Sequence, residues 1–305
     1  MANSLAGYVT KFTNKLDETL LKGPCTSDLN MNQDLLGEMS GAGEIKIAKI
    51  AMDGLADHTR GGGFVRGKIT TDWETLKLEF DRDREFSIDS LDDEERDAIV
   101  SANIMKEFAR EKVVPEVDAI RFAKLASKSG ATVAKTLSSA DDAFSALLTA
   151  EEAIEDLGGD LSKCILYCTS AYRNLLRKKQ NYDLKQGEDP NGKFVTFDDM
   201  KIVTVPQTRF YTAIDLLDGV TKTGSGETLV DETPGGYKKA STAKNINFMV
   251  VDPRAAAAIA KHQKLRYFAP DTNQSDDAHL WQYRLFHDLL VYENKKGLIY
   301  THTAA

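Results

Sequence analysis

The stretch "ADHTRGGGFVRG", residues 56–67, places three consecutive glycines between two arginines. The fold depends on whether these glycines form a phosphate-binding loop or the tip of a hairpin. A glycine-rich loop that binds phosphate follows a strand and opens a helix, so that backbone N–H groups converge on the anion. The sequence predicts strands on both sides of this loop instead. A phosphate site is therefore not expected here.

Both flanks of the glycines show the two-residue alternation that is typical of a half-buried strand. Upstream, "EIKIAKIAM" at 44–52 sets Ile45 and Ile47 on one side of Lys46. Downstream, apolar and charged residues alternate in "LKLEFD" at 76–81. The glycines are thus predicted at the tip of a long hairpin, where residues that tolerate positive φ are needed. Because a two-stranded ribbon is only marginally stable alone in water, it is expected to lie on another surface.

The composition predicts a globular protein rather than a membrane or nucleic-acid-binding one. The chain has 305 residues, of which 42% are hydrophobic, enough for two compact units. No stretch approaches the roughly 18 apolar residues of a membrane span, and the N-terminus lacks the apolar core of a signal peptide. We therefore expect the chain to stay in the cytoplasm where it is made. The net charge of -8 argues against tight nucleic-acid binding.

The three cysteines predict neither a disulfide nor a metal site. Cys25 stands alone, whereas Cys164 and Cys168 lie four apart in "KCILYC" and are predicted on one face of a buried strand. Zinc sites need more ligands at characteristic spacings, and none lie nearby. The cysteines are expected to be small buried apolar groups, and no metal is expected.

The strongest helix signal runs from Leu91 to Lys128. Ser90 can cap its N-terminus, the acidic residues at 92–95 suit the helix dipole, and Gly130 follows its basic end. Unbroken, such a helix would be about 57 Å long at 1.5 Å per residue. Pro115 lies inside the pattern, which predicts either a kinked helix or two abutting helices.

The rest of the chain reads as a small α/β unit followed by long strands. The predicted elements, in order, are a helix at 140–157, the strand "CILYCTS" (164–170), a helix capped at Ser170, the strands "KFVTF" (193–197) and "KIVTVP" (201–206), the strand "NINFMVV" (245–251), the helix "PRAAAAIAKHQ" (253–263), and strands in "WQYRLFHDLLVYEN" (281–294) and "GLIYTHT" (297–303).

Motifs that could support catalysis have simpler explanations. "GEDPNGKF" at 187–194 has P-loop spacing, but Phe194 replaces the magnesium-binding Ser or Thr and "DPNG" predicts a turn. "TGSGET" at 223–228 is predicted to be a surface loop. The carboxylates of "SLDDEERD" at 90–97 suit a helix N-terminus. Nothing pairs a nucleophile with a base, so no catalytic residue and no cofactor are expected.

The order of these features resembles the major capsid protein of tailed bacteriophages, whose fold is named for phage Hong Kong 97. The resemblance covers about residues 44–303 and is carried by these stretches: "RGGGFVRGKITTDWETLKLEFDRDREFSIDSLDDEE", "IMKEFAREKVVPEVDAIRFAKLA", "IVTVPQTRF", "KNINFMVVDPRA" and "YRLFHDLLVYENKKGLIYTH". It implies an α+β fold and a structural protein, not an enzyme, that self-assembles into an icosahedral shell around double-stranded DNA.

The resemblance also implies names for the parts of the chain. These are an N-arm at 1–43, an E-loop at 44–86, a peripheral domain with a spine helix at 87–135, an axial domain at 136–265, a peripheral return strand at 266–290 and an axial C-terminal strand at 291–305. In relatives the E-loop lies across a neighbouring subunit, so the glycine tip is expected in an intersubunit contact. The residues expected there are Arg60, Gly61, Gly62, Gly63, Arg66 and Lys68 of the tip, which would face Asp92, Asp93, Glu94 and Glu95.

The partners implied are copies of the chain in hexamers and pentamers, a portal protein, and packaged DNA held non-specifically. Because the arm begins at Met1, any scaffold is expected to be a separate chain. The expected location is the virion, assembled in the bacterial host cytoplasm. Two alternatives stay open, an encapsulin-type compartment that encloses a cargo enzyme, and a soluble α/β enzyme that uses the glycine loops.

Overall fold

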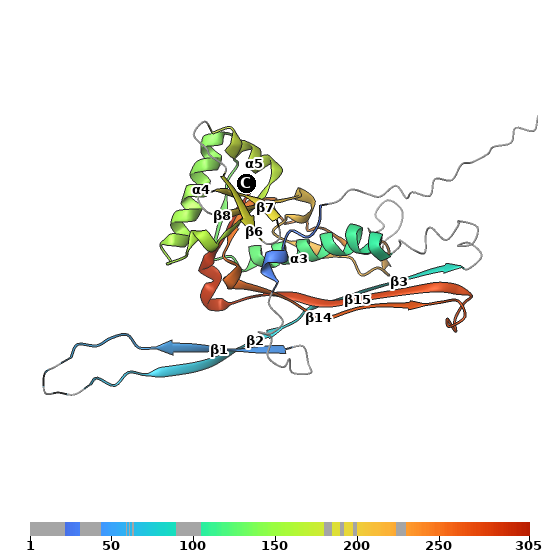
Figure 1. Cartoon of the computed structure of the whole chain (residues 1–305), viewed down its shortest axis with the longest axis horizontal. Coiled ribbons are helices and arrows are strands. Elements are labelled where there is room, and N and C mark those ends of the chain that lie inside the picture. Colours follow the sequence, from blue (N-terminus) through green and yellow to red (C-terminus); the bar gives the residue numbers. More distant parts are fainter. Residues whose placement is uncertain are drawn as a thin grey trace, which may run out of the picture.

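The structure is a computed structural model that describes residues 22–30, 44–58, 60, 62, 64–89, 105–179, 185–189, 192–197, 200–223 and 230–305. Figure 1 shows three parts one below another: a compact unit around α4 and α5, a long sheet of β14, β15 and β3 with α3 running along it, and the hairpin β1–β2. The described chain is therefore a mixture of helix and sheet in which strands predominate.

A seven-stranded mixed sheet forms the compact unit, in the order β4-β16-β13-β5-β8-β7-β6. The pairs β16–β4 and β5–β8 are parallel and the other neighbours are antiparallel. The strands are β4 (Ala131–Ala134), β5 (Ile165–Thr169), β6 (Lys185–Asp189), β7 (Gly192–Phe197), β8 (Met200–Val205), β13 (Ile246–Val251) and β16 (Ile299–Thr303).

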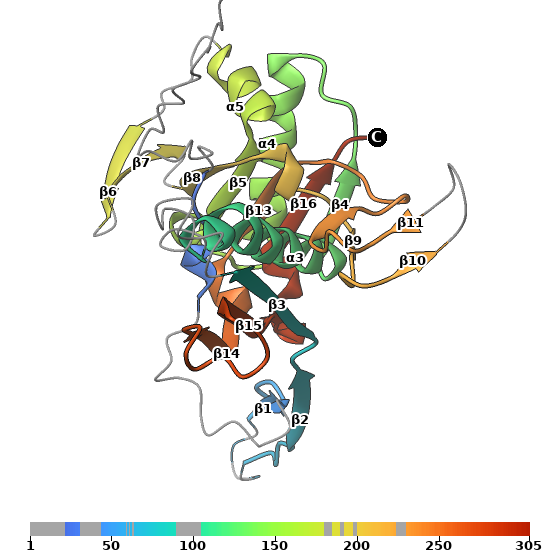
Figure 2. The same cartoon turned by 90° about the vertical axis from the view of Figure 1, so that its right-hand side faces the viewer.

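The central strand β5 is buried on both faces, so that two cores form. Leu166 and Cys168 pack into one core with α4 (Ala140–Glu155) and α5 (Ser170–Arg177), and Cys164 joins them on the same face, as predicted. Ile165 and Tyr167 pack into the other core with α3 (Val114–Ser127). Figure 2 shows α3 between the compact unit and the long sheet. The α3 helix therefore joins the two.

The long predicted helix is a single helix over its described part. The backbone is helical from Met105 to Ser127, with a π-helical segment, η3 (Ala109–Val113), immediately before Pro115. Proline has no N–H to donate and its ring needs space against the preceding turn, which a widened π turn provides. The irregularity predicted from Pro115 is thus absorbed within one helix. Residues 90–104, and with them Ser90 and the acidic start, lie outside the described residues.

The long sheet has the order β14-β15-β3, with β14 (Ala256–Phe268) paired antiparallel to β15 (Ala278–Val291), and β15 antiparallel to β3 (Phe80–Asp89). The helix predicted at 253–263 is wrong, because only η7 (Pro253–Ala255) is helical and β14 begins at Ala256. Alanine favours helices, but here Ala256 and Ala258 are buried in a core against the segment 22–30. Tertiary packing has overridden the local preference.

A second correction concerns the start of α5. Its N-cap is Thr169, not Ser170, because the Thr169 hydroxyl accepts a hydrogen bond from the Tyr172 N–H at 3.2 Å. The turn predicted in "GEDPNGKF" lies between β6 and β7, which pair antiparallel with Asp189 opposite Gly192, and its central residues 190 and 191 lie outside the described residues. The loop 224–229 lies outside the described residues.

The segment 22–30 is fixed in the core by buried charges. The Asp118 carboxylate accepts hydrogen bonds from the Thr26 hydroxyl at 2.7 Å and from the Arg209 guanidinium at 3.1 Å. Arg209 also donates to the Lys22 and Gly23 carbonyls, and Arg121 donates to Thr26. Asp118 and Arg209 are almost completely buried, so their charges compensate each other in a low-dielectric site.

The remaining elements are short. They are η1 (Ser27–Leu29), η4 (Leu161–Lys163), η5 (Gln207–Arg209), β9 (Ile214–Leu216), β10 (Lys222–Thr223), β11 (Val230–Asp231), β12 (Tyr237–Lys239) and η8 (Glu293–Leu298). The pairs β9–β12 and β10–β11 form a loop structure at 214–239 that reaches β3, where Arg82 and Arg84 donate to the Gly236 and Thr233 carbonyls.

Candidate intersubunit surface

The outer half of the hairpin, from Lys49 to Met52 and from Ile69 to Trp73, has one apolar face. Strands β1 (Glu44–Met52) and β2 (Ile69–Lys77) pair antiparallel, with Met52 opposite Ile69 and Ile50 opposite Thr71. Directly opposite residues share a face, and every second residue along a strand does too. That face carries four large apolar side chains, which are 61–70% exposed: Ile50, Met52, Ile69 and Trp73. The other face carries Lys49, Ala51, Thr70 and Asp72.

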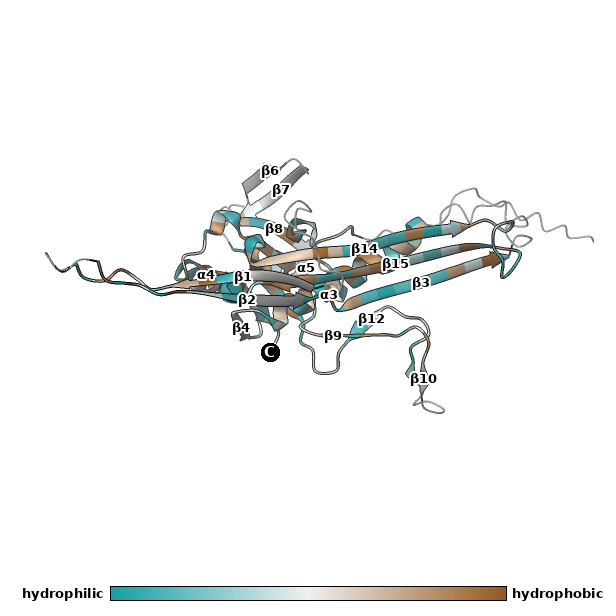
Figure 3. Cartoon of the chain, turned by 90° about the horizontal axis from the view of Figure 1, so that it is seen from below, coloured by the Kyte–Doolittle hydropathy of each residue, from teal (hydrophilic) through white to brown (hydrophobic). Residues whose placement is uncertain are grey.

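No described part of the chain covers this face. Every described residue from Ile50 to Trp73 is exposed, and Leu55 and Phe64 at the tip are almost fully so. Figure 3 shows the hairpin tip and the far end of the long sheet projecting in opposite directions. Contiguous apolar surface of this kind marks an interaction site, because its exposure to water is unfavourable.

The root of the hairpin, in contrast, is held firmly. Leu78 is buried, and the Glu79 N–H donates to the Asp288 carboxylate at 3.2 Å. Lys124 of α3 reaches both groups, with its Nζ 2.6 Å from Asp288 Oδ2 and 2.9 Å from Glu79 Oε2. Burial raises the pKa of Asp288, while the hydrogen bonds from Lys124 lower it. The chain is thus anchored to the long sheet and to α3 at the point where β2 leads into β3.

The predicted contact residues are only partly described. Arg60, Gly62, Arg66 and Lys68 lie at the exposed tip, as the hairpin prediction requires. Beyond the β1–β2 ladder, the Asp53 carboxylate accepts a hydrogen bond from the Lys68 N–H at 2.6 Å. The other predicted residues, Gly61, Gly63, Asp92, Asp93, Glu94 and Glu95, lie outside the described residues. Whether the two sets meet stays a prediction.

The described titratable groups form no activated nucleophile. Burial raises the pKa of Cys25 to about 11 and those of Cys164 and Cys168 to about 12, which keeps these thiols protonated. Burial and the nearby cations lower the pKa of His287 to about 4.

Within the described ranges, no cluster of three or more His, Cys, Asp or Glu side chains could hold a metal ion, and no helix is long and apolar enough to cross a membrane.

Sequence reasoning missed two features, one on the surface and one in the core. The apolar face at Ile50 and Trp73 follows from the strand register, and the alternation of apolar residues through 48–52 was an available signal. The ion pair of Asp118 with Arg209 joins residues that are far apart in sequence. No local pattern could have indicated that pair.

Comparison with solved structures finds the same fold in phage capsids. The "Capsid structure of the Cyanophage P-SCSP1u" matches with a TM-score of 0.65 at 12% identity, over 98% of this chain and 93% of that one. The "Asymmetric unit of bacteriophage PhiM1 mature capsid" matches with a TM-score of 0.63 at 12% identity, over 98% and 92%. "The capsid of Myoviridae Phage XM1" matches with a TM-score of 0.59 at 12% identity, over 100% and 99%.

These likenesses show that the chain has the fold of phage capsid structures, as its resemblance to the major capsid proteins implied. They extend over almost the full length of each chain. No family model matches the sequence, and no curated protein matches it.

Proposed function

We propose that this chain is the major capsid protein of a tailed bacteriophage and self-assembles into the icosahedral head shell that encloses the phage's double-stranded DNA. Its activity is association with copies of itself, and it performs no catalytic step. The fold shared with phage capsids along nearly the full chain supports this function.

The observation that carries the proposal is the exposed apolar face of the hairpin. Ile50, Ile69 and Trp73 are more than half exposed on a ribbon that is anchored at Leu78 and Glu79. Burying each such side chain is worth about 1.5–3 kcal/mol. The ribbon therefore gains its missing support when it lies on a neighbouring copy. Each shell repeats this contact many times, so modest individual contacts give a durable assembly.

The proposed parts follow the fold named for phage Hong Kong 97. Residues 1–43 form the N-arm, whose base is fixed at 22–30 by Asp118, and 44–86 form the E-loop. The helix that ends in α3 is the spine helix of the peripheral domain, which also contains the three-stranded sheet. The seven-stranded sheet with α4 and α5 is the axial domain. Because β14 already pairs with β15 from Ala256, we place the return to the peripheral domain there.

The hairpin tip contributes charge as well as apolar surface to the proposed contact. Arg60, Arg66 and Lys68 are exposed cations. We propose that they approach an acidic stretch of the neighbouring copy that begins with Asp92, Asp93, Glu94 and Glu95 and also contains Glu107 and Glu111. Each exposed pair is weak and screened by salt, so the charges direct the register of assembly more than they stabilise it.

The further partners of the proposed function are those of a phage head. The copies form hexamers and pentamers in the virion shell, with a portal protein at one vertex, and assembly takes place in the bacterial host cytoplasm, directed by a separate scaffolding protein. Contact with the packaged DNA is non-specific. The net charge of -8 suits a wall that does not bind the DNA sliding past it.

The proposal is tested by expressing the chain in bacteria, with and without the neighbouring phage genes, and examining the product by sedimentation and electron microscopy. Closed icosahedral shells, filled with nuclease-protected DNA when the packaging genes are present, are expected. Shells that enclose a protein cargo instead of DNA would identify a compartment protein. A monomer that gains thermal stability from a small ligand would identify an enzyme.

A further inference from the structure

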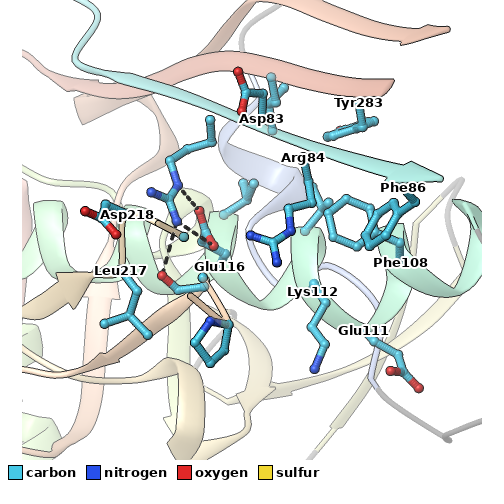
Figure 4. Close-up of a pocket in the computed structure, with 18 of the residues that line it drawn as sticks. Asp83, Arg84, Phe86, Phe108, Glu111, Lys112, Glu116, Leu217, Asp218 and Tyr283 are labelled. Carbon is cyan, nitrogen blue, oxygen red and sulfur yellow. Dashed lines mark hydrogen bonds and ion pairs between the residues drawn. The ribbon is translucent and has the colours of Figure 1, made fainter. Parts of the chain in front are cut away.

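A large cavity lies between the long sheet and the segment that leads into α3. Its volume is about 610 Å³, and it is lined by β3, by η3 and the adjoining helix, and by the loop structure at 214–239. Figure 4 shows Phe86 and Phe108 side by side at one end, with Glu116 and Asp218 toward the other. The cavity therefore has an aromatic end and a polar end.

The aromatic end is formed by three rings that already contact one another. The Phe108 ring is 4.9 Å from Phe86 and 5.9 Å from Tyr283 between centroids, in both cases edge to face. Leu285, Val113 and Val117 extend the apolar lining. An aromatic side chain that enters this end would find further edge-to-face partners, which is a favoured geometry for ring pairs.

The polar lining of the cavity contains more carboxylates than cations. Six carboxylates and three fixed cations line it, and three of the carboxylates already have arginine partners: Asp81 with Arg284, Glu107 with Arg110 and Glu116 with Arg82. The Glu107 Oε2 atom accepts a hydrogen bond from Arg110 at 2.6 Å. The other oxygen of this carboxylate, Oε1, is buried and receives no hydrogen bond among the described residues. Glu111 has no ion-pair partner in the described part of the chain, and in Figure 4 its carboxylate points away from the rings. A buried carboxylate oxygen without a donor favours a cationic partner from outside.

The hairpin tip carries the complementary chemistry. Phe64 is 95% exposed, and from His58 to Lys68 the sequence contains three cations, Arg60, Arg66 and Lys68, and no carboxylate. The exposed Phe64 ring, flanked by cations in the sequence, is complementary to a cavity that has aromatic side chains at one end and carboxylates in its lining. Within one chain the tip projects away from the end of the long sheet that holds the cavity, so the matching tip belongs to another copy (Figure 1).

We propose that this cavity receives Phe64 of a neighbouring copy, whose Arg60 and Arg66 lie beside Glu107 and Glu111. The inference rests on the proposed function, because it needs assembled copies, and it specifies one anchoring pocket within that contact. Phe64 is then the anchor of the hairpin contact, and the apolar face of the strands behind it is a broad secondary contact. Anchors of this kind commonly dominate an interface.

Photo-crosslinking tests the pocket directly. Phe64 is replaced by p-benzoylphenylalanine, and the unlabelled variant is co-assembled with nitrogen-15-labelled wild-type chain, irradiated and analysed by mass spectrometry. Crosslinks from unlabelled tip peptides to labelled peptides that contain Phe86, Phe108 or Tyr283 are expected. The matched control is the same replacement at Leu55, which is equally exposed at the tip and should yield at least tenfold fewer of these crosslinks.

The outcomes separate this inference from the proposed function. Shells whose Phe64 crosslinks lie elsewhere would overturn the pocket and leave the capsid function standing. A wild-type chain that never forms shells would overturn both. Crosslinks within one chain would also overturn the pocket, because they would place the tip against its own sheet.

A charge swap covers the case in which the photoreactive variant does not enter shells. The Arg66→Glu variant is expected to raise the critical concentration for assembly about fivefold, the size of one rim ion pair. Adding Glu111→Arg to the same chain should restore assembly, whereas Lys112→Glu, one residue along the same segment, should not. Failure of Glu111→Arg to restore assembly would contradict the pairing.

Discussion

The segment 22–30 and the hairpin 44–77 both belong to the N-terminal part of the chain, yet they are held in opposite ways. The segment is tied into the core by Asp118 and Arg209, which are both almost fully buried. The hairpin is held only at its root, and every described residue from Ile50 to Trp73 is exposed. One element completes the fold of a single copy, whereas in our proposal the other is completed by a neighbour.

The difference teaches where stability and assembly reside in this molecule. Changes in the buried ion pair should alter the folding of the subunit, whereas changes on the hairpin face should alter association and leave folding intact.

Removing the buried carboxylate should have the largest effect. The Asp118→Ala variant leaves Arg209 and Arg121 buried without their anion, which costs about 3–5 kcal/mol of unfolding free energy. Urea denaturation of unassembled subunits measures this loss. The control is Asp141→Ala, which removes an exposed partner of Lys179 and should cost less than about 1 kcal/mol. Equal losses in the two variants would show that the segment 22–30 is not anchored as described.

Placing a charge on the apolar face should block assembly without unfolding the subunit. The Trp73→Asp variant loses about 2–3 kcal/mol of burial free energy at each intersubunit contact. The critical concentration for assembly should therefore rise more than tenfold. The unfolding free energy should change by less than about 0.5 kcal/mol, since the side chain is exposed in the subunit. Thr70→Asp introduces the same charge on the opposite face and should assemble. Normal shells from Trp73→Asp would refute the assignment of the contact face.

The stability of the subunit should fall as the pH falls from about 6.5 toward 4. Burial and the charges of Arg121, Lys124 and Arg82 lower the pKa of His287 to about 4, whereas in the unfolded chain it is near 6.5. The unfolded state therefore binds the proton first, and stability is lost on acidification. Between pH 7.5 and pH 5 this amounts to about 2 kcal/mol.

The His287→Gln variant isolates that contribution, because glutamine does not titrate. Its unfolding free energy should depend on pH less steeply than that of the wild type over the same range, as followed by urea denaturation of unassembled subunits. Parallel pH profiles for the two proteins would mean that His287 does not titrate between these states.

The smallest effect is expected from the tip charges. The double variant Arg66→Glu, Lys68→Glu should raise the critical concentration several-fold at low salt, and the difference from wild type should shrink as salt is added. Light scattering at a series of salt concentrations measures it. A salt-independent difference would indicate that the tip acts through its shape rather than its charge.

Much of this architecture could be predicted from local patterns. The hairpin, the strand "CILYCTS" and the helix through Pro115 each follow from periodicity and from turn or cap residues. The error at 253–263 arose because alanine favours helices, whereas packing against the segment 22–30 and pairing with β15 decide that stretch. The buried pair of Asp118 and Arg209 depends on the tertiary fold alone, so no sequence pattern indicates it.

The candidate contact was predictable in its location but not in its chemistry. The glycine tip and its cations were visible in the sequence, whereas the continuous apolar face depends on which residues of β1 and β2 lie opposite each other. The cavity beside β3 depends on the loop structure at 214–239 reaching the sheet, a long-range contact.

The apolar face of the hairpin should be exposed in the subunit and buried against a neighbour in the shell. The chain has two tryptophans, of which Trp73 is 62% exposed and Trp281 is 7% exposed. Acrylamide quenching of a Trp281→Phe protein therefore reports on Trp73 alone. We predict strong quenching in unassembled subunits and protection in shells. Equal quenching in the two states, or protection already in the lone subunit, would contradict the account.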